Sequence, residues 1–424
     1  MKEVSFHYGK GKITHSFSEE ELIAVLESSI NSFSPDFSER ELVEKAMQNP
    51  VGTVRLNELA KGKKNIVIIA SDHTRPVPSK LIIPPMLKEI REGNPNAEIS
   101  ILIATGCHRG TTKDELVSKF GNEIVKNEKI YIHDCDDNEN LVNIGILPSG
   151  SACEINKLAA EADLLIAEGF IEPHFFAGFS GGRKSVLPGV ASRSTVLGNH
   201  CSEFIASPFA KTGVLENNPI HQDMLWAAKK AKLAYIVNVV LNAEKEVIYA
   251  VAGDAEKAHK EGTDFLLKLC KAESKEADIV ISTNGGYPLD QNVYQAVKGM
   301  TAAEATVKDG GVIIMMAKSD DGIGGEHFYR QLADESDIDK TMALFMARNK
   351  AQTVPDQWQT QVFLRVLKKA KVIYISEMDA EVIEKMHMIP AKSIAEAMEK
   401  ARKLLNKNKV SITAIPDGIS VIVK

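Results

Sequence analysis

The sequence predicts an α/β protein with two domains, each a mostly parallel sheet flanked by helices. Three observations support this class. The chain has 424 residues, which exceeds the size at which a single core stops growing. Short apolar runs alternate with amphipathic segments, as they do in parallel sheets whose two faces are covered by helices. Polar clusters follow several of these runs directly, at the strand ends where open α/β sheets bind their ligands.

The first series of apolar runs predicts an N-terminal domain over residues 1–272. Its runs are typical of strands that are buried on both faces, and amphipathic segments such as SKLIIPPMLKEIRE and HQDMLWAAKKAK lie between them. The predicted strands are Asn65 to Ala70, Ile99 to Thr105, Asp163 to Gly169, Ala234 to Asn242 and Val247 to Asp254.

A second series begins after the charged stretch KLCKAESKEAD and predicts a C-terminal domain over residues 273–408. Its predicted strands are Asp278 to Thr283, Gly311 to Ala317 and Lys371 to Ser376. Segments such as QNVYQAVKGMTAAEA and QWQTQVFLRVLKKA predict the helices between them. The tail, residues 409–424, predicts one more strand and turn, which either closes this sheet or returns to the N-terminal domain.

The composition excludes several classes of protein. Apolar residues make up 44% and charged residues 25% of the chain, which is ordinary for a soluble globular protein. The net charge of −6 offers no basic surface for nucleic acid. No apolar run approaches the roughly 18 residues of a membrane span, and the N-terminus lacks the apolar core of a secretory signal, so we expect a cytoplasmic protein. The five cysteines form no CxxC pair, and we expect reduced, mostly buried thiols.

Two polar clusters follow the first two predicted strands. In SDHTRPVPS, Arg75 and backbone amides near a helix start can hold a phosphate, and Asp72 can accept hydrogen bonds from a ribose or orient a neighbour. A plain capping turn explains this cluster about equally well. In TGCHRGTT, His108 stands just past a strand and suits general base chemistry, although a lone surface histidine is the more ordinary interpretation.

The segment Ile171 to His200 places Lys184 on a glycine-rich bend, with His174 and His200 on either side. Its GFSGGRKS stretch is not a Walker A loop, because Arg183 stands where that loop has glycine directly before the lysine. If partly buried, a lysine beside an arginine has a lowered pKa and suits covalent attachment; the alternative is a solvated pair on a flexible turn. His200 can bind a metal, but one imidazole cannot hold a metal alone and the sequence offers no further ligand cluster.

Gln295 and Lys298 lie three residues apart in NGGYPLDQNVYQAVKGM. On a predicted helix they share a face. An amide and an ammonium group side by side suit a small carboxylate, although a solvated helix face is the more ordinary interpretation without further context.

Taken together, these segments resemble the nickel-dependent lactate racemase family, a group of nickel-pincer-nucleotide racemases and epimerases of 2-hydroxy acids. The resemblance is carried by the DHTRPVPS loop, the TGxHR loop, the HFFAGFSGGRKSVLPG segment with a histidine shortly after it, and STNGGYPLDQxxYQAVKGM. It runs from about Val51 to the C-terminal strand and therefore covers both predicted domains.

The resemblance implies a cofactor and a role for each matching residue. The cofactor is a nickel-pincer nucleotide (pyridinium-3,5-bisthiocarboxylic acid mononucleotide) joined to Lys184 through a thioamide, with His200 as the protein ligand of nickel. Cofactor-synthesis proteins would load it. The other matching residues are Asp72, His73, Thr74 and Arg75 as contacts to the nucleotide, His108 and His174 as the acid/base pair, and Gln295 and Lys298 as contacts to the substrate carboxylate.

The activity that the resemblance implies is interconversion of D- and L-lactate in an active site in the interdomain cleft. Because the Cα–H of lactate is scarcely acidic beside a carboxylate, we expect hydride transfer to and from the tethered cofactor through a pyruvate intermediate. Three alternatives stay open. They are racemisation or epimerisation of another 2-hydroxy acid, an ATP-dependent transferase built on GFSGGRKS, and a non-catalytic nickel or nucleotide carrier.

Overall fold

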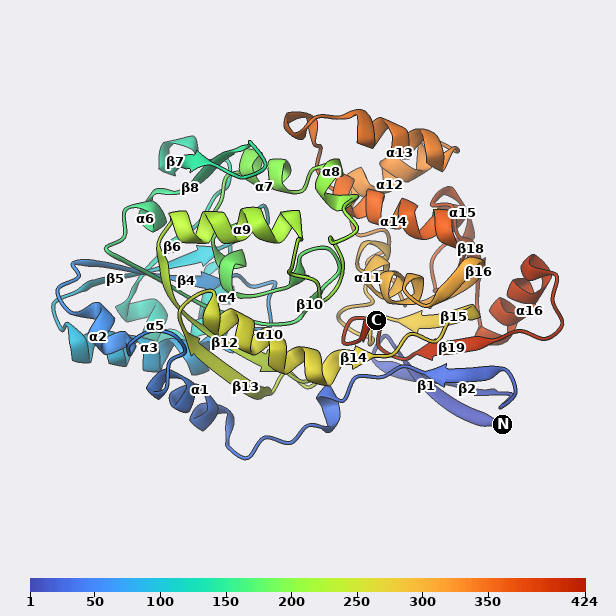
Figure 1. Ribbon diagram of the computed structural model, residues 1–424, viewed down its shortest axis with the longest axis horizontal. Helices are drawn as coiled ribbons and strands as arrows, with labels where there is room; N and C mark the ends of the chain where they lie inside the picture. The colour runs from blue at the N-terminus through green and yellow to red at the C-terminus, as the bar shows by residue number, and fades with distance from the viewer. The chain divides into compact units, whose positions relative to one another are not determined.

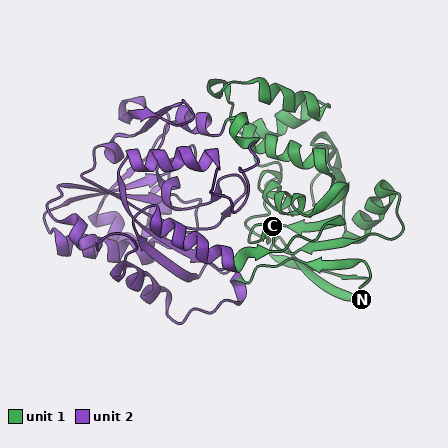
Figure 2. Cartoon of the chain, viewed as in Figure 1, with its two compact units in different colours: residues 1–29, 201–206, 269–424 green, residues 30–200, 207–268 purple.

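The computed structural model describes residues 1–424, which divide into two compact units (Figures 1 and 2). Unit 1 comprises Met1–Ser29, Cys201–Ala206 and Leu269–Lys424, and unit 2 comprises Ile30–His200 and Ser207–Lys268. Each unit contains a six-stranded sheet with helices packed on it. The predicted α/β class with parallel-rich sheets is confirmed.

The sheet of unit 2 has the strand order β13-β12-β9-β4-β5-β6 and is parallel except for β13. Its strands are β4 (Asn65–Ser71), β5 (Glu98–Ala104), β6 (Lys129–Ile132), β9 (Leu164–Phe170), β12 (Leu233–Leu241) and β13 (Val247–Gly253). Two small antiparallel pairs accompany it, β7 (Leu141–Ile146) with β8 (Ala152–Asn156) and β10 (Pro173–His174) with β11 (Gly178–Phe179). Since β9, β4 and β5 are parallel neighbours, the loops that follow them leave the same edge of the sheet.

Helices cover both faces of this sheet. Successive side chains of a strand point to opposite faces, and because the central strands are apolar throughout, both faces must be covered. Ile66 and Ile68 of β4 and Ile101 and Ile103 of β5 belong to one core with residues of α1 to α5. Figure 1 shows α9 across the sheet from α3. The helical elements of unit 2 are η1 (Ile30–Ser32), α1 (Glu39–Gln48), α2 (Leu56–Ala60), α3 (Ser79–Gly93), α4 (Lys113–Phe120), α5 (Asn122–Asn127), η2 (Asn138–Asn140), α6 (Lys157–Ala160), η3 (Gly182–Ser185), α7 (Arg193–Asn199), α9 (Pro219–Lys230) and α10 (Lys257–Cys270), which runs past the unit boundary.

The sheet of unit 1 has the order β18-β17-β16-β15-β19-β3, and every neighbouring pair is parallel. Its strands are β3 (Leu22–Val25), β15 (Ala277–Thr283), β16 (Val307–Met316), β17 (Lys371–Ile375), β18 (Ile389–Ala391) and β19 (Ile412–Ile415). Two further pairs are β1 (Lys2–Tyr8) with β2 (Gly11–Phe17) and β14 (Lys271–Ala272) with β20 (Ile422–Val423). The helical elements are α8 (Ser202–Ile205), α11 (Val293–Glu304), α12 (Glu326–Ala333), α13 (Ile338–Ala347), η4 (Lys350–Gln352), α14 (Gln357–Lys369), α15 (Ala380–Lys385) and α16 (Ile394–Leu405). Each helix of the chain falls short, in length or in apolar character, of what a bilayer crossing needs.

Both ends of the chain complete the sheet of unit 1, which differs from the predicted N-terminal domain of residues 1–272. β19 lies between β15 and β3, with Ile412 opposite Leu22. Phe6 and Phe17 of the β1–β2 hairpin are buried in the same core as Ile281 of β15. The tail therefore does not return to the first sheet. β3 pairs with a segment almost 400 residues away in sequence, a distance over which local patterns carry no information.

Candidate active site

The loop after β4 holds a buried carboxylate against the histidine of the loop after β5. His108 Nδ1 lies 2.8 Å from Asp72 Oδ2, and Asp72 is 1% exposed. The backbone N–H and the hydroxyl of Thr74 donate to the other oxygen, Asp72 Oδ1, at 3.1 and 2.7 Å. Burial alone would raise the pKa of Asp72, but the hydrogen bonds from His108 and Thr74 outweigh it, and the pKa is lowered. Because an ionised carboxylate only accepts, His108 carries its proton on Nδ1 and Nε2 is its basic nitrogen.

Asp72 thus has both oxygens bound within the protein. The sequence left two roles open for this residue, accepting bonds from a ribose or orienting a neighbour. The hydrogen bonds to His108 and Thr74 favour the second of these roles.

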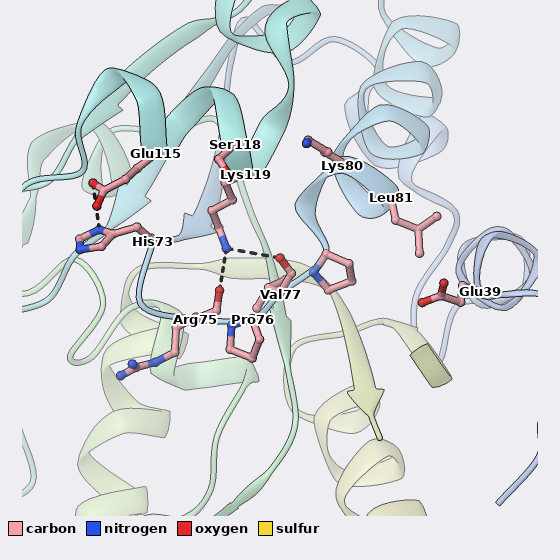
Figure 3. Close-up of a pocket in the computed structure, with 11 residues that line it drawn as sticks. Glu39, His73, Arg75, Pro76, Val77, Lys80, Leu81, Glu115, Ser118 and Lys119 are labelled. Carbon is pink, nitrogen blue, oxygen red and sulfur yellow. Dashed lines mark hydrogen bonds and ion pairs between the residues drawn. The ribbon is translucent and has the colours of Figure 1, made fainter. Parts of the chain in front are cut away.

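His73 and Arg75 of the same loop line a pocket of about 510 Å³ (Figure 3). His73 Nδ1 lies 3.1 Å from Thr111 Oγ1 and 3.8 Å from a carboxylate oxygen of Glu115. From α4, Lys119 reaches the loop and donates to the carbonyl of Arg75 at 3.1 Å. The pocket therefore combines cations with acidic groups; its remaining lining residues are Glu39, Pro76, Val77, Pro78, Lys80, Leu81 and Ser118.

A second buried carboxylate, Glu168 of β9, binds both ends of this loop. Its Oε1 accepts from the backbone N–H and the hydroxyl of Ser71, both at 3.1 Å, and from the hydroxyl of Ser79 at 2.7 Å. Burial raises the pKa of Glu168, and the neighbouring Lys119 opposes that rise. Glu168 ties the end of β4 to the start of α3. Glu168 was not among the residues predicted from the sequence, although a carboxylate inside an apolar strand is a signal that could have identified it.

Lys184 lies in the short helical turn η3, directly after a bend that only glycine can form. Gly181 and Gly182 have φ of 81° and 54°. A Cβ on Gly182 would lie 2.7 Å from the ring of His259, and a Cβ on Gly181 would lie 2.8 Å from Asn238 Oδ1. The Gly182 N–H donates to that same Asn238 oxygen at 2.8 Å. Asn238, an amide within the apolar strand β12, therefore fixes the turn that presents Lys184.

Arg183 is buried and is 1% exposed. Its Nη1 and Nη2 donate to the carbonyls of Phe179 and Ala177, both at 2.8 Å, and its Nε donates to His221 Nδ1 at 3.0 Å. Burial lowers the pKa of Arg183 to about 9 and, together with the arginine charge, that of His221 to about 3. The solvated Lys-Arg pair considered from the sequence is therefore wrong, because the arginine is buried and fastens the turn from inside.

His174 and His200 both pack against Phe176. Their ring centroids lie 4.6 and 5.1 Å from that of Phe176, each in an edge-to-face arrangement. His174 Nδ1 accepts from the N–H of Ala177 at 3.3 Å. The neutral His174 ring therefore carries its proton on Nε2, which is the opposite tautomer to that of His108.

His200 is held as a neutral imidazole. Its Nδ1 lies 3.0 Å from the carbonyl oxygen of Val196, and because a carbonyl only accepts, Nδ1 carries the proton and Nε2 does not. Burial, together with the charge of Lys184, lowers the pKa of His200 to about 3. A neutral ring with an unprotonated Nε2, oriented through its other nitrogen, is the form in which histidine binds metals.

The loop that holds His108 and the turn that holds Lys184 are joined through the backbone of unit 2. Gly106 donates to the carbonyl of Gly189 at 2.9 Å, and the Gly189 N–H donates to the carbonyl of Lys184 at 3.1 Å. The predicted residues of unit 2 therefore gather at one edge of its sheet, after β4, β5 and β9.

Gln295 and Lys298 lie in unit 1, on the first turns of α11. The side chain of Asn292 caps this helix by accepting from the Gln295 N–H at 2.9 Å. Both predicted residues are half-buried, whereas Ala296 and Val297 between them are buried. The predicted helix is confirmed, and the amide and the ammonium group share its partly exposed face.

Comparisons with known proteins agree over the whole chain. Residues 8–213 match the family described as lactate racemase N-terminal domain, and residues 272–423 match lactate racemase C-terminal domain. Two proteins named lactate racemase, from Thermoanaerobacterium thermosaccharolyticum and Lactiplantibacillus plantarum, are each 53% identical over 100% of both chains. The solved structure of the lactate racemase apoprotein from Thermoanaerobacterium thermosaccharolyticum matches with a TM-score of 0.96 at 52% identity, covering 100% of both chains. The chain therefore belongs to the lactate racemase family and is an isomerase.

Proposed function

We propose that this protein racemises lactate, interconverting its D and L enantiomers. The names of its full-length relatives support the substrate. The structural observation that carries the proposal is the contact of His108 Nδ1 with the ionised Asp72, which leaves Nε2 of His108 as its basic nitrogen. Racemisation needs one group that removes a proton from the substrate oxygen and another that returns a proton to it.

In this proposal, His108 and His174 exchange roles between the two directions of the reaction. His108 Nε2 takes the hydroxyl proton of one enantiomer, and the ionised Asp72 stabilises the imidazolium that forms. His174, in its imidazolium form, then gives a proton to the oxygen after the acetyl group has rotated to present its other face. General acid–base catalysis of this kind contributes about 10²–10⁴-fold for each group.

We also propose that the protein carries the nickel-pincer nucleotide, covalently bound at Lys184. The donor chemistry fits, because His200 is buried, neutral and has an unprotonated Nε2, as a nickel ligand requires. His73, Thr74 and Arg75 would contact the nucleotide, and the cations of the adjacent pocket suit a phosphate. When bound, the cofactor supplies a hydride acceptor, so that lactate passes through pyruvate without forming a dianion.

Gln295 and Lys298 are proposed to hold the substrate carboxylate. An ammonium group and an amide on one half-buried helix face can bind the two oxygens of a carboxylate together. This contact would persist in pyruvate, which keeps the carboxylate, and would therefore prevent its release during the turn of the acetyl group.

The test is racemisation by protein produced together with cofactor-synthesis proteins. L-lactate and D-lactate are supplied separately, and the enantiomers are followed by chiral chromatography while intact mass reports the adduct at Lys184. We expect both reactions to converge on an equal mixture, and His108→Ala and His174→Ala to abolish turnover. Full activity in both variants would refute the acid/base assignment. Adduct-bearing protein that turns over no 2-hydroxy acid would instead indicate a carrier.

A further inference from the structure

Two cysteines that the proposed reaction does not use lie beside His108. β5 and β6 are parallel neighbours, and Cys107 and Cys135 stand in the loops that follow them. The hydroxyl of Thr105 donates to the carbonyl of His133 at 2.6 Å, which fastens the two loops together. Thr105 and His133 each stand two residues before one of these cysteines, so the bond brings Cys107 and Cys135 to neighbouring positions, and both cysteines are free.

The surroundings make Cys107 the more reactive thiol. The neighbouring Cys135 lowers the pKa of the Cys107 thiol, and the charge of Arg193 acts in the same direction. Arg193 is held in place by two bonds to Asp136, at 2.8 and 2.7 Å, and its N–H donates to the carbonyl of Cys135 at 3.0 Å. Cys107 is half-buried, whereas Cys135 is 5% exposed. Since the thiolate is the nucleophile, an oxidant from solvent meets Cys107 first.

We propose that Cys107 and Cys135 form a redox-modification site at which a peroxide converts two thiols into a disulfide. The Cys107 thiolate attacks the O–O bond of hydrogen peroxide, forms a sulfenic acid and releases hydroxide. The Cys135 thiol then attacks the sulfenic sulfur, the S–S bond forms and water leaves. Two thiols and one peroxide give one disulfide and two waters, so the sulfurs lose two electrons and the peroxide gains them.

The disulfide acts on His108 because Cys107 is its chain neighbour. An S–S bond of about 2.05 Å is much shorter than a contact between two thiols. Closing it pulls Cys107 toward Cys135 and shifts His108 from its 2.8 Å contact with Asp72. A displacement of about 1 Å in a catalytic group can cost about 10²-fold in rate. The modification stands on the thiol pair alone, and only its effect on rate rests on the proposed role of His108.

The test treats the loaded enzyme with stoichiometric hydrogen peroxide, then catalase, and measures intact mass, non-reduced peptide maps and lactate racemisation. We expect a loss of 2 mass units, a peptide that joins Cys107 to Cys135, and at least about a tenfold fall in kcat that dithiothreitol reverses. Absence of the Cys107–Cys135 peptide would overturn the site. The mass readout needs no turnover, so a failure of lactate racemisation leaves this part of the test intact.

Two variants separate the thiol pair from damage elsewhere. Cys135→Ser should keep its activity before peroxide, form no disulfide and resist the reversible loss of kcat. Cys153→Ser removes another buried thiol of unit 2 and should behave as the unsubstituted enzyme does. If Cys135→Ser loses activity to peroxide as fast and as reversibly as the parent, the proposed effect on His108 is refuted.

Discussion

The carboxylate of Asp72 lies 2.8 Å from Nδ1 of His108, and this contact joins the ends of the neighbouring strands β4 and β5. It fixes which nitrogen of His108 is basic. The parallel register of β4 and β5 positions the two loops, since Ser71 lies opposite Ala104 at the ends of the paired strands. The register of the two strands therefore places the positioning residue Asp72, in the loop after β4, beside the proposed base.

Asp72→Asn should lower kcat for lactate by about 10²–10⁴-fold with little change in KM, because an amide can donate to Nδ1 and stabilise the wrong tautomer. Steady-state kinetics on protein whose adduct is verified by intact mass would check this. The exposed Asp134→Asn is the matched control and should stay within about twofold. Full kcat in loaded Asp72→Asn would contradict the positioning role, and loss of the adduct would point to a cofactor contact.

Arg183→Lys should destabilise the protein by about 2–4 kcal/mol, because lysine cannot satisfy the carbonyls of Phe179 and Ala177 and His221 together. The free energy of unfolding in urea measures this cost. Arg40→Lys, an exposed arginine of α1 in the same unit, should change it by less than about 0.5 kcal/mol. Equal effects of the two substitutions would show that the buried guanidinium does not fasten the turn.

His221 should make the protein less stable in mild acid. The unfolded chain protonates a histidine near pH 6.5, whereas burial holds the folded pKa of His221 at about 3. Stability is therefore lost as the pH falls below about 6.5, by up to about 1.4 kcal/mol per pH unit from this residue. His221→Asn keeps an acceptor for Arg183 and should lose about 1 kcal/mol less than the parent between pH 7 and pH 5.5. Parallel urea curves for both proteins across this range would refute the assignment.

Lys298→Gln should raise KM for lactate by about 10–100-fold, because it removes a charge-assisted hydrogen bond to the carboxylate. Initial rates over a range of L-lactate concentrations measure this change. Lys340→Gln, an exposed lysine of α13 in the same unit, should leave KM unchanged. An unaltered KM in Lys298→Gln would exclude this residue from substrate binding.

Much of the fold was accessible from the sequence because its central strands are continuous apolar runs. β4, β9 and β12 begin and end within one residue of their predicted bounds. The edge strands could not be predicted from the sequence. β3 and β18 are short and only partly buried, and β3 depends on a partner near the other end of the chain. Pairing over that distance is decided by tertiary packing, which local periodicity does not report.

The residues of the candidate site were identified more readily than their surroundings. His108, His174, Lys184 and His200 stand out as chemical groups in glycine-rich loops. The partners that orient them did not stand out, because each partner is brought close either by the parallel register of two strands or by packing in the core. Arg183 was expected beside Lys184, and nothing local shows that His221, 38 residues further along, accepts its hydrogen bond inside the core.

The fate of the Cα hydrogen tests the central claim most directly. Loaded enzyme racemises lactate deuterated at Cα in ordinary water, and mass spectrometry follows the label in both enantiomers. Transfer of the hydrogen as hydride to an enzyme-bound acceptor and back predicts that deuterium is retained through inversion and that pyruvate can be trapped. Loss of the label to solvent at each inversion, with no pyruvate trapped, would contradict the account and indicate direct deprotonation.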